Sequence, residues 1–175
     1  MRAPLTIRTA RLTIRRPAKA DARAVFARYA SDAEATRYMS WPTHRSVADA
    51  RAFVVRALEE WSRNGVGPYL LELDGEVIGS TGLHLLAPYR AMTGYILARD
   101  QWGRGFATEA CLAMVELGRT LGLARVEAQC HADHRASARV LEKSGMALQG
   151  VLRRYLVLPN LSNEPQDVRS YAWTR

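Results

Sequence analysis

The chain has 175 residues, a length typical of one folded domain built around one hydrophobic core. With 48% hydrophobic and 24% charged residues it has the composition of a soluble globular protein, and no run of about 18 apolar residues predicts a membrane-spanning helix. The net charge of +8 attracts acidic partners, but the arginines are scattered, which favours a solvated basic surface over a nucleic-acid-binding patch. We therefore expect a single domain over residues 1–175, with no membrane insertion.

The N-terminus and the cysteines indicate the cellular compartment. The first 16 residues alternate Leu and Ile with Arg and Thr and lack the apolar core of a secretory signal, so a cytoplasmic protein is expected. Cys111 and Cys130 are the only cysteines and form no CxxC pair. This pattern predicts neither a disulfide framework nor a zinc site, and we expect no bound metal.

The first half of the chain predicts one strand and two helices. Leu and Ile alternate with polar residues over 11–16, which predicts a half-buried strand. Apolar residues at helical spacing then predict a short helix capped by Asp21. A longer helix over 47–64 is expected to begin with Ser46 and Asp49 as a capping box.

The second half alternates strands and helices. Asp74–Gly75 separates two strand-like runs, YLLEL and EVIGSTGLHLL, and this dipeptide is a strong hairpin signal. The remaining predicted elements are a strand over 92–98, a helix over 107–121, a strand over 125–131, a helix over 135–144 and two strands over 146–158 and 167–174. This order predicts a mixed α/β (α+β) fold, and no internal repeat or linker divides it.

The segment QWGRGFATEA, residues 101–110, places small residues directly in front of the helix predicted over 107–121. A glycine-rich turn at a helix N-terminus exposes unpaired amides at the positive end of the helix dipole, where phosphate groups bind. The segment lacks both the G-K-[ST] of a nucleoside-triphosphate P-loop and the third glycine of a dinucleotide fingerprint. By itself it indicates either a phosphate-binding loop or a tight turn whose small residues serve helix packing.

Four further motifs change this interpretation. GYILARDQWGRGFATEA, HRASARVLEKSGM, GVLRRYLVLPN and DVRSYAW occur in an order that resembles the GNAT N-acetyltransferase superfamily, and within it the Rim-type ribosomal-protein N-terminal acetyltransferases. The resemblance extends from RLTIRRP to the end of the chain. It implies the GNAT fold, a mixed, mostly antiparallel sheet with helices on both faces. It also implies that acetyl-CoA binds where the sheet splays between its fourth and fifth strands, here the strands over 92–98 and 125–131.

The resemblance assigns the glycine loop to the pyrophosphate of coenzyme A. The cofactor-binding residues that it implies there are Trp102, Gly103, Arg104, Gly105, Phe106, Ala107 and Thr108. A backbone amide of Ile96, Leu97 or Ala98, where the strand of the family bulges, is expected to meet the acetyl carbonyl. His134 stands where the family has an asparagine, and its imidazole is expected to make the corresponding contact with the cofactor.

The implied reaction is a direct attack of the amine on the thioester in a ternary complex. Ser137 matches the serine that contacts the cofactor and gives a proton or hydrogen bond to the leaving thiolate. Met92 stands where Rim-type enzymes commonly have a glutamate base. The candidates for the base are therefore His84, Glu72 or a water relay, and His84 is preferred because its ordinary pKa is about 6.5.

Three further residues belong to the acceptor pocket or to the last hairpin. Trp41 matches a region that shapes the acceptor pocket in relatives, but it also fits a hydrophobic plug over two helices. Asp167 is expected to fix the last hairpin, and Tyr155 lies in a family-like segment near it.

The expected activity is N-acetylation of a primary amine, first of all a protein N-terminal α-amine such as that of a ribosomal protein. A small-molecule amine, an antibiotic or a polyamine, is the alternative acceptor. Because Met92 replaces the usual base, a non-catalytic acyl-CoA-binding module also fits the sequence. Association with ribosomes or RNA through the positive charge is a further alternative, and the chain is expected to be a monomer or a homodimer.

Overall fold

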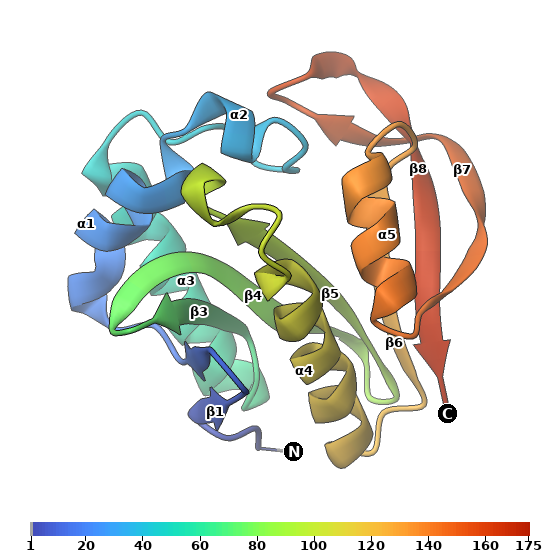
Figure 1. Cartoon of the computed structure of the whole chain (residues 1–175), viewed down its shortest axis with the longest axis horizontal. Coiled ribbons are helices and arrows are strands. Elements are labelled where there is room, and N and C mark those ends of the chain that lie inside the picture. The colour runs from blue at the N-terminus through green and yellow to red at the C-terminus, as the bar shows by residue number, and fades with distance from the viewer. Residues whose placement is uncertain (1) are drawn as a thin grey trace.

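Strands and helices alternate in the computed structural model, which describes residues 2–175 (Figure 1). The strands are β1 (Thr6–Arg8), β2 (Thr13–Arg15), β3 (Pro68–Leu73), β4 (Glu76–Ala87), β5 (Arg90–Leu97), β6 (Arg125–His131), β7 (Ala147–Leu158) and β8 (Ser162–Thr174). The helices are α1 (Ala22–Val25), α2 (Ala33–Thr36), α3 (Val47–Asn64), α4 (Phe106–Thr120) and α5 (Arg135–Lys143). Further helical turns cover Lys19–Asp21, Phe26–Ala30 and Arg99–Gln101.

The long periodic elements lie at or near their predicted boundaries, whereas several short ones were missed. The prediction omitted β1 and α2, which are too short to show a period, and it began β8 too late. It was also wrong about Asp21, which forms no side-chain hydrogen bond at the start of α1. The Asp21 carboxylate accepts hydrogen bonds from the Ala18 amide (2.6 Å) and from the Arg15 guanidinium (2.8 Å) instead.

All eight strands form one sheet in the order β1-β2-β3-β4-β5-β6-β8-β7. Each neighbouring pair is antiparallel except β5 and β6, which are parallel. Over the described residues this parallel pairing comprises only Arg90↔Arg125, Ala91↔Val126 and Met92↔Glu127, after which the two strands diverge (Figure 1). The predicted splay is therefore confirmed, and it lies between the two strands that were expected to form it.

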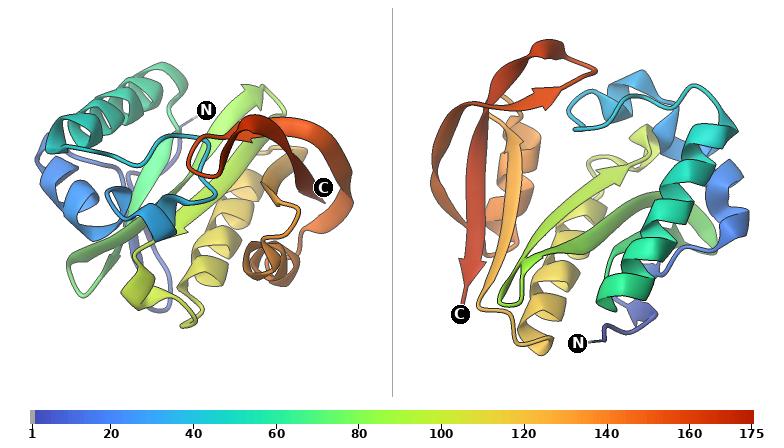
Figure 2. Two further views of the ribbon diagram at one scale, coloured as in Figure 1. Left: turned by 90° about the horizontal axis from the view of Figure 1, so that it is seen from above. Right: turned by 180° about the vertical axis from the view of Figure 1, so that it is seen from behind.

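Helices cover both faces of the sheet (Figure 2). Helices α1 and α3 contact β3 and β4 on one face, while α4 and α5 pack on the other face and against each other. The neighbours Leu70 and Leu71 on β3 are both fully buried, and they belong to two different hydrophobic clusters. Successive side chains of a strand point to opposite faces, so a strand covered on both sides has the continuous apolar run seen here. None of the helices over 2–175 is long and apolar enough to cross a membrane.

The bulge expected around Ile96–Ala98 is absent from β5. Strands β4 and β5 keep one register from Gly79↔Leu97 as far as Leu85, and the register shifts only beyond that point. The main-chain groups on one side of β5 become free because β6 turns away, so no bulge is required to open the sheet.

Candidate active site

A cavity of about 580 Å³ lies where β5 and β6 diverge. Its walls come from α3, β4, β5, β6, α5 and the connection between α2 and α3. The predicted site residues that line it are His84, Ile96, His134 and Ser137. Trp41 and Met92 line the same cavity, whereas residues 102–108 lie outside its lining. The structure thus brings the predicted catalytic side chains together and places the glycine loop beyond them.

The loop in front of α4 has the backbone conformation that its glycines permit. Gly103 and Gly105 have φ angles of 73° and 84°, in the left-handed region that costs a residue with a Cβ atom about 1–2 kcal/mol. A Cβ atom at Gly103 would meet nothing within 4 Å, so conformation and not crowding requires a glycine there. At Gly105 a Cβ atom would lie 3.3 Å from the Arg11 guanidinium.

The amides of this loop and of the first turn of α4 are available to a ligand. Within residues 2–175, the Trp102 amide donates a backbone hydrogen bond to the Arg99 carbonyl. The next amide along the chain that donates one is that of Glu109, to the Gly105 carbonyl (3.1 Å). The amides of residues 103–108 therefore remain unpaired at the positive end of the helix dipole. This is the arrangement that binds a pyrophosphate, and so the loop fits coenzyme A.

Arg11 and Glu109 hold the loop in place, a role that no sequence pattern indicated. Arg11 donates to the Arg104 carbonyl (2.8 Å) and to the Glu109 carboxylate (2.7 Å), and its guanidinium lies 4.4 Å from the ring centre of Phe106. Burial raises the pKa of Glu109, but hydrogen bonds from Thr9 and Arg11 outweigh it and lower the pKa below its ordinary value. The N-terminal hairpin is thereby fastened to the first turn of α4.

The two large side chains of the loop also bind to the protein itself. Arg104 donates to the Gln101 side chain (2.6 Å), and its guanidinium lies 4.9 Å from the ring centre of Phe106. The Trp102 indole donates to the Leu97 carbonyl at 3.0 Å. Because both side chains are already hydrogen-bonded within the protein, the backbone amides are the groups of this loop that remain free to bind a phosphate.

Of the three residues expected to supply an amide for the acetyl carbonyl, only Leu97 has the required orientation. The Ala98 amide donates to the Ile78 carbonyl of β4 (2.8 Å). Amides alternate between the two sides of a strand, so that of Ile96 also points to β4, while those of Tyr95 and Leu97 point away from it. They face the opening that β6 leaves.

Ser137 lies in the first turn of α5, and its hydroxyl oxygen accepts a hydrogen bond from the Tyr95 hydroxyl at 2.9 Å. Tyr95 extends from β5, so this bond crosses the opening of the sheet. Burial raises the pKa of Tyr95, and its hydroxyl therefore keeps its proton. A serine hydroxyl that accepts one hydrogen bond still has its own hydrogen to give. Tyr95 was not among the predicted site residues, and its only signal in the sequence was its place in the G-Y pair of the family strand.

His84 and Met92 are direct cross-strand neighbours on β4 and β5, so their side chains project from the same face of the sheet. The Nδ1 atom of His84 lies 2.8 Å from one carboxylate oxygen of Glu60 on α3 and 3.0 Å from the other. Glu60 was not singled out from the sequence. The other candidate base, Glu72, accepts a hydrogen bond from Arg15 at 2.6 Å and lies outside the cavity lining.

His134 contacts the connection between α2 and α3. Its ring stacks on that of Tyr38, with ring centres 4.4 Å apart, and His131 lies 5.2 Å from the same ring. Burial lowers the pKa of His134, which favours the neutral imidazole at neutral pH. Trp41, in the same connection, lies 5.0 Å from His44. Trp41 lines the cavity and also packs against the hydrophobic cluster of α1 and α3, so it covers the two helices as its second interpretation expected.

Near the end of the chain, Asp167 holds the last hairpin as expected. Its carboxylate accepts hydrogen bonds from the Arg154 amide and from the Arg153 guanidinium, both at 2.8 Å. Arg154 has a φ angle of 46°, so this contact supports a strained residue. Tyr155 is 55% exposed and lies outside the cavity lining.

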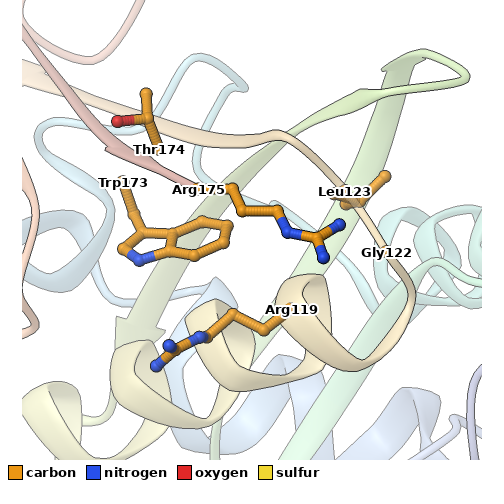
Figure 3. Close-up of a pocket in the computed structure, with 6 residues that line it drawn as sticks. All are labelled: Arg119, Gly122, Leu123, Trp173, Thr174 and Arg175. Carbon is orange, nitrogen blue, oxygen red and sulfur yellow. The ribbon is translucent and has the colours of Figure 1, made fainter.

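A second hollow, of about 480 Å³, lies at the other end of α4 (Figure 3). Arg119, Trp173 and Arg175 line it, and the Arg119 guanidinium lies 5.5 Å from the Trp173 ring centre. It contains none of the predicted site residues and no group suited to proton transfer at neutral pH. Within residues 2–175, the predicted site residues His84, Ile96, His134 and Ser137 line the first cavity and not this one.

This combination of a splayed sheet, an unpaired helix N-terminus and a cavity lined by His84 and Ser137 agrees with the comparisons with known proteins. Residues 11–147 match the family model described as the acetyltransferase (GNAT) domain, and the chain belongs to this family. It is an acetyl-CoA-dependent N-acetyltransferase, which binds acetyl-CoA and an amine acceptor. One relative is the uncharacterized N-acetyltransferase YoaA of Bacillus subtilis, which is 34% identical over an alignment of 172 residues that covers 95% of this chain and 94% of YoaA.

Two solved structures are similar over nearly their whole length. RimL, a ribosomal L7/L12 alpha-N-protein acetyltransferase in complex with coenzyme A, has a TM-score of 0.84 and 21% identity, covering 98% of this chain and 97% of RimL. The microcin C7 self-immunity acetyltransferase MccE, in complex with acetyl-CoA and AMP, has a TM-score of 0.85 and 19% identity, covering 95% and 94%. These likenesses confirm the predicted fold.

Proposed function

We propose that this enzyme acetylates the α-amine of a protein N-terminus by direct attack on acetyl-CoA bound between β5 and β6. The observation that carries the proposal is that Ser137 and His84, a hydrogen-bond donor and a proton acceptor, line one cavity. Forming an amide from an amine and a thioester requires both, because the amine loses a proton and the leaving thiolate carries negative charge. The similarity to RimL supports an N-terminal α-amine as the acceptor.

Acetyl-CoA supplies the thioester carbonyl and the thiolate that leaves. The amides of residues 103–108 hold its pyrophosphate at the N-terminus of α4. The Leu97 amide, on the open side of β5, donates to the acetyl oxygen as negative charge develops there. The pantetheine arm of coenzyme A carries amide groups, which can form hydrogen bonds with the unpaired main-chain groups along the same edge of β5.

Ser137 donates a hydrogen bond to the leaving thiolate and so stabilises its negative charge. The thiolate takes up a proton from water, which balances the proton that the amine loses to His84. The Tyr95 hydroxyl fixes the serine oxygen at 2.9 Å and polarises the O–H bond of Ser137, because hydrogen bonds in a chain strengthen one another. Tyr95 acts through Ser137 and is a positioning residue.

His84 takes the proton from the attacking amine. The Glu60 carboxylate binds the Nδ1–H group of the ring, which leaves Nε2 as the basic nitrogen. Because His84 pairs with Met92, the base stands one strand away from the position at which Rim-type enzymes have their glutamate. In this proposal the base is His84 on β4, next to Met92 on β5. The methionine at the usual position of the base therefore does not indicate that the enzyme is inactive.

The test is thiol release from acetyl-CoA in the presence of peptides with different N-termini, intact ribosomes, polyamines and aminoglycosides, with mass spectrometry to locate the acetyl group. We expect release with peptides or ribosomes and an acetyl group on the α-amine. Turnover of polyamines or aminoglycosides alone would identify a small-molecule acetyltransferase. Calorimetric binding of acetyl-CoA without turnover of any acceptor would identify a binding module.

A further inference from the structure

One side chain, Asn160, fastens the turn between β7 and β8 to the connection between α2 and α3. Its amide nitrogen donates to the carbonyls of Thr36 (2.7 Å) and Trp41 (2.9 Å). Its oxygen accepts from the Thr43 amide (2.8 Å) and from the Thr43 hydroxyl (3.1 Å). These bonds use both donors and both acceptor positions of the asparagine, and they join segments more than a hundred residues apart in the chain.

The connection between α2 and α3, residues 37–46, depends on such contacts for its shape. It contains no helix or strand, and the turn that it meets lies at the end of the β7–β8 hairpin (Figure 2). We call this connection the roof, because Tyr38, Trp41 and His44 within it line the cavity. Leu156 of β7 lines the cavity near the same contact.

The roof borders the part of the site that the acceptor must enter. The cavity lining includes the roof, His84 and Ser137 but none of residues 102–108, which form the pyrophosphate loop. The cofactor therefore reaches the reacting groups from the loop, and the roof encloses the remaining side. Three of the four bonds of Asn160 go to main-chain atoms, so the contact fixes the path of the roof whatever its side chains.

We propose that Asn160 is a positioning residue that sets acceptor selectivity. By fixing the roof it limits the width of the acceptor entrance, so that a slim chain end is accepted and a bulky one is disfavoured. The inference rests on the proposed function, because it takes the cavity as the acceptor site. To that function it adds the contact that decides which size of acceptor the enzyme accepts.

The experiment compares Asn160→Ala with Asn163→Ala, a matched change at an exposed asparagine of the same hairpin. The probes are two hexapeptides that differ only in an N-terminal serine or tryptophan. For Asn160→Ala we expect kcat/KM for the seryl peptide relative to the tryptophanyl peptide to fall about tenfold, as the loss of four partly buried hydrogen bonds allows. The KM for acetyl-CoA should stay within about twofold, since the pyrophosphate loop is untouched. Asn163→Ala should change neither value.

An unchanged ratio of kcat/KM between the two peptides would overturn the inference. So would an equal loss of kcat/KM for both peptides together with a raised KM for acetyl-CoA, because Asn160 would then serve stability alone. If the wild-type enzyme acetylates neither peptide, the proposed acceptor fails, and the same ratio is measured with spermine and kanamycin as the slim and the bulky amine. Hydrogen exchange gives a readout without turnover. The inference requires that residues 37–46 exchange faster in Asn160→Ala than in the wild type, with no such change in Asn163→Ala. Equal exchange in both variants overturns it.

Discussion

The hydroxyl groups of Tyr95 and Ser137 form a two-membered hydrogen-bond chain, and its order predicts how each substitution affects turnover. Tyr95→Phe removes only the first hydroxyl, so kcat should fall about tenfold while the KM for acetyl-CoA stays nearly constant. Ser137→Ala should lower kcat by about a hundredfold or more, because the donor itself is lost. In the double variant, Tyr95→Phe should have no additional effect.

Tyr69→Phe is the matched control for this prediction, since the Tyr69 hydroxyl is also bonded, to the Pro4 carbonyl at 2.7 Å, but lies away from the cavity. Steady-state kinetics of the four variants provide the measurement. Additive effects of Tyr95→Phe and Ser137→Ala would mean that Tyr95 does not act through Ser137.

The pairing of His84 with Met92 permits a rescue experiment. His84→Gln should lower kcat/KM for the acceptor about a hundredfold, because the proton acceptor is lost. Met92→Glu in the same chain should restore part of this loss, since a carboxylate then projects from the adjacent position of the same face. Rates at several pH values check both variants. Wild-type activity in His84→Gln would assign the proton to water or another group.

At the scale of elements, the N-terminus of α4 can be tested by two equivalent substitutions. Gly105→Ala and Gly122→Ala each place a Cβ atom on a residue of positive φ and should each destabilise the protein by about 1–2 kcal/mol. Only Gly105→Ala should also weaken acetyl-CoA binding strongly, because strain there displaces the amides that meet the pyrophosphate. Isothermal calorimetry and urea denaturation separate the two effects. Equal binding by both variants would exclude the loop as the pyrophosphate site.

Elements and contacts differ in how far the sequence predicts them. The hairpin at Asp74–Gly75 and the helices α3, α4 and α5 follow from local periodicity and turn residues, and the family motifs add the splay of the sheet. Contacts between distant segments leave no such pattern. Arg11, Glu60 and Asn160 became visible only when the fold brought them to Glu109, His84 and the roof. The same holds for Tyr95, whose partner Ser137 lies on another element.

At the scale of the whole molecule, the two parts of the sheet, β1–β5 and β6–β8, meet in only three residue pairs within residues 2–175. Acetyl-CoA bound between them should stabilise the fold by about 2.7 kcal/mol at a hundred times its Kd. It should also slow hydrogen exchange of the Tyr95 and Leu97 amides more than that of Leu71, which lies in β3 between two paired strands. Exchange measured by mass spectrometry with and without the cofactor is the check. Equal protection at all three residues would place the cofactor elsewhere.

The divergence of β5 and β6 opens an inner edge along each of these strands, in addition to the outer edges at β1 and β7. An exposed sheet edge is a hazard, because another polypeptide can pair with it and start aggregation. Here the inner edges lie in the interior, and α4 and α5 pack against each other on one face beside them. A narrow arm that carries amide groups can enter such a space, whereas a second protein strand, with side chains on both faces, cannot. The fold thus keeps main-chain groups free for a small ligand without offering them to other chains.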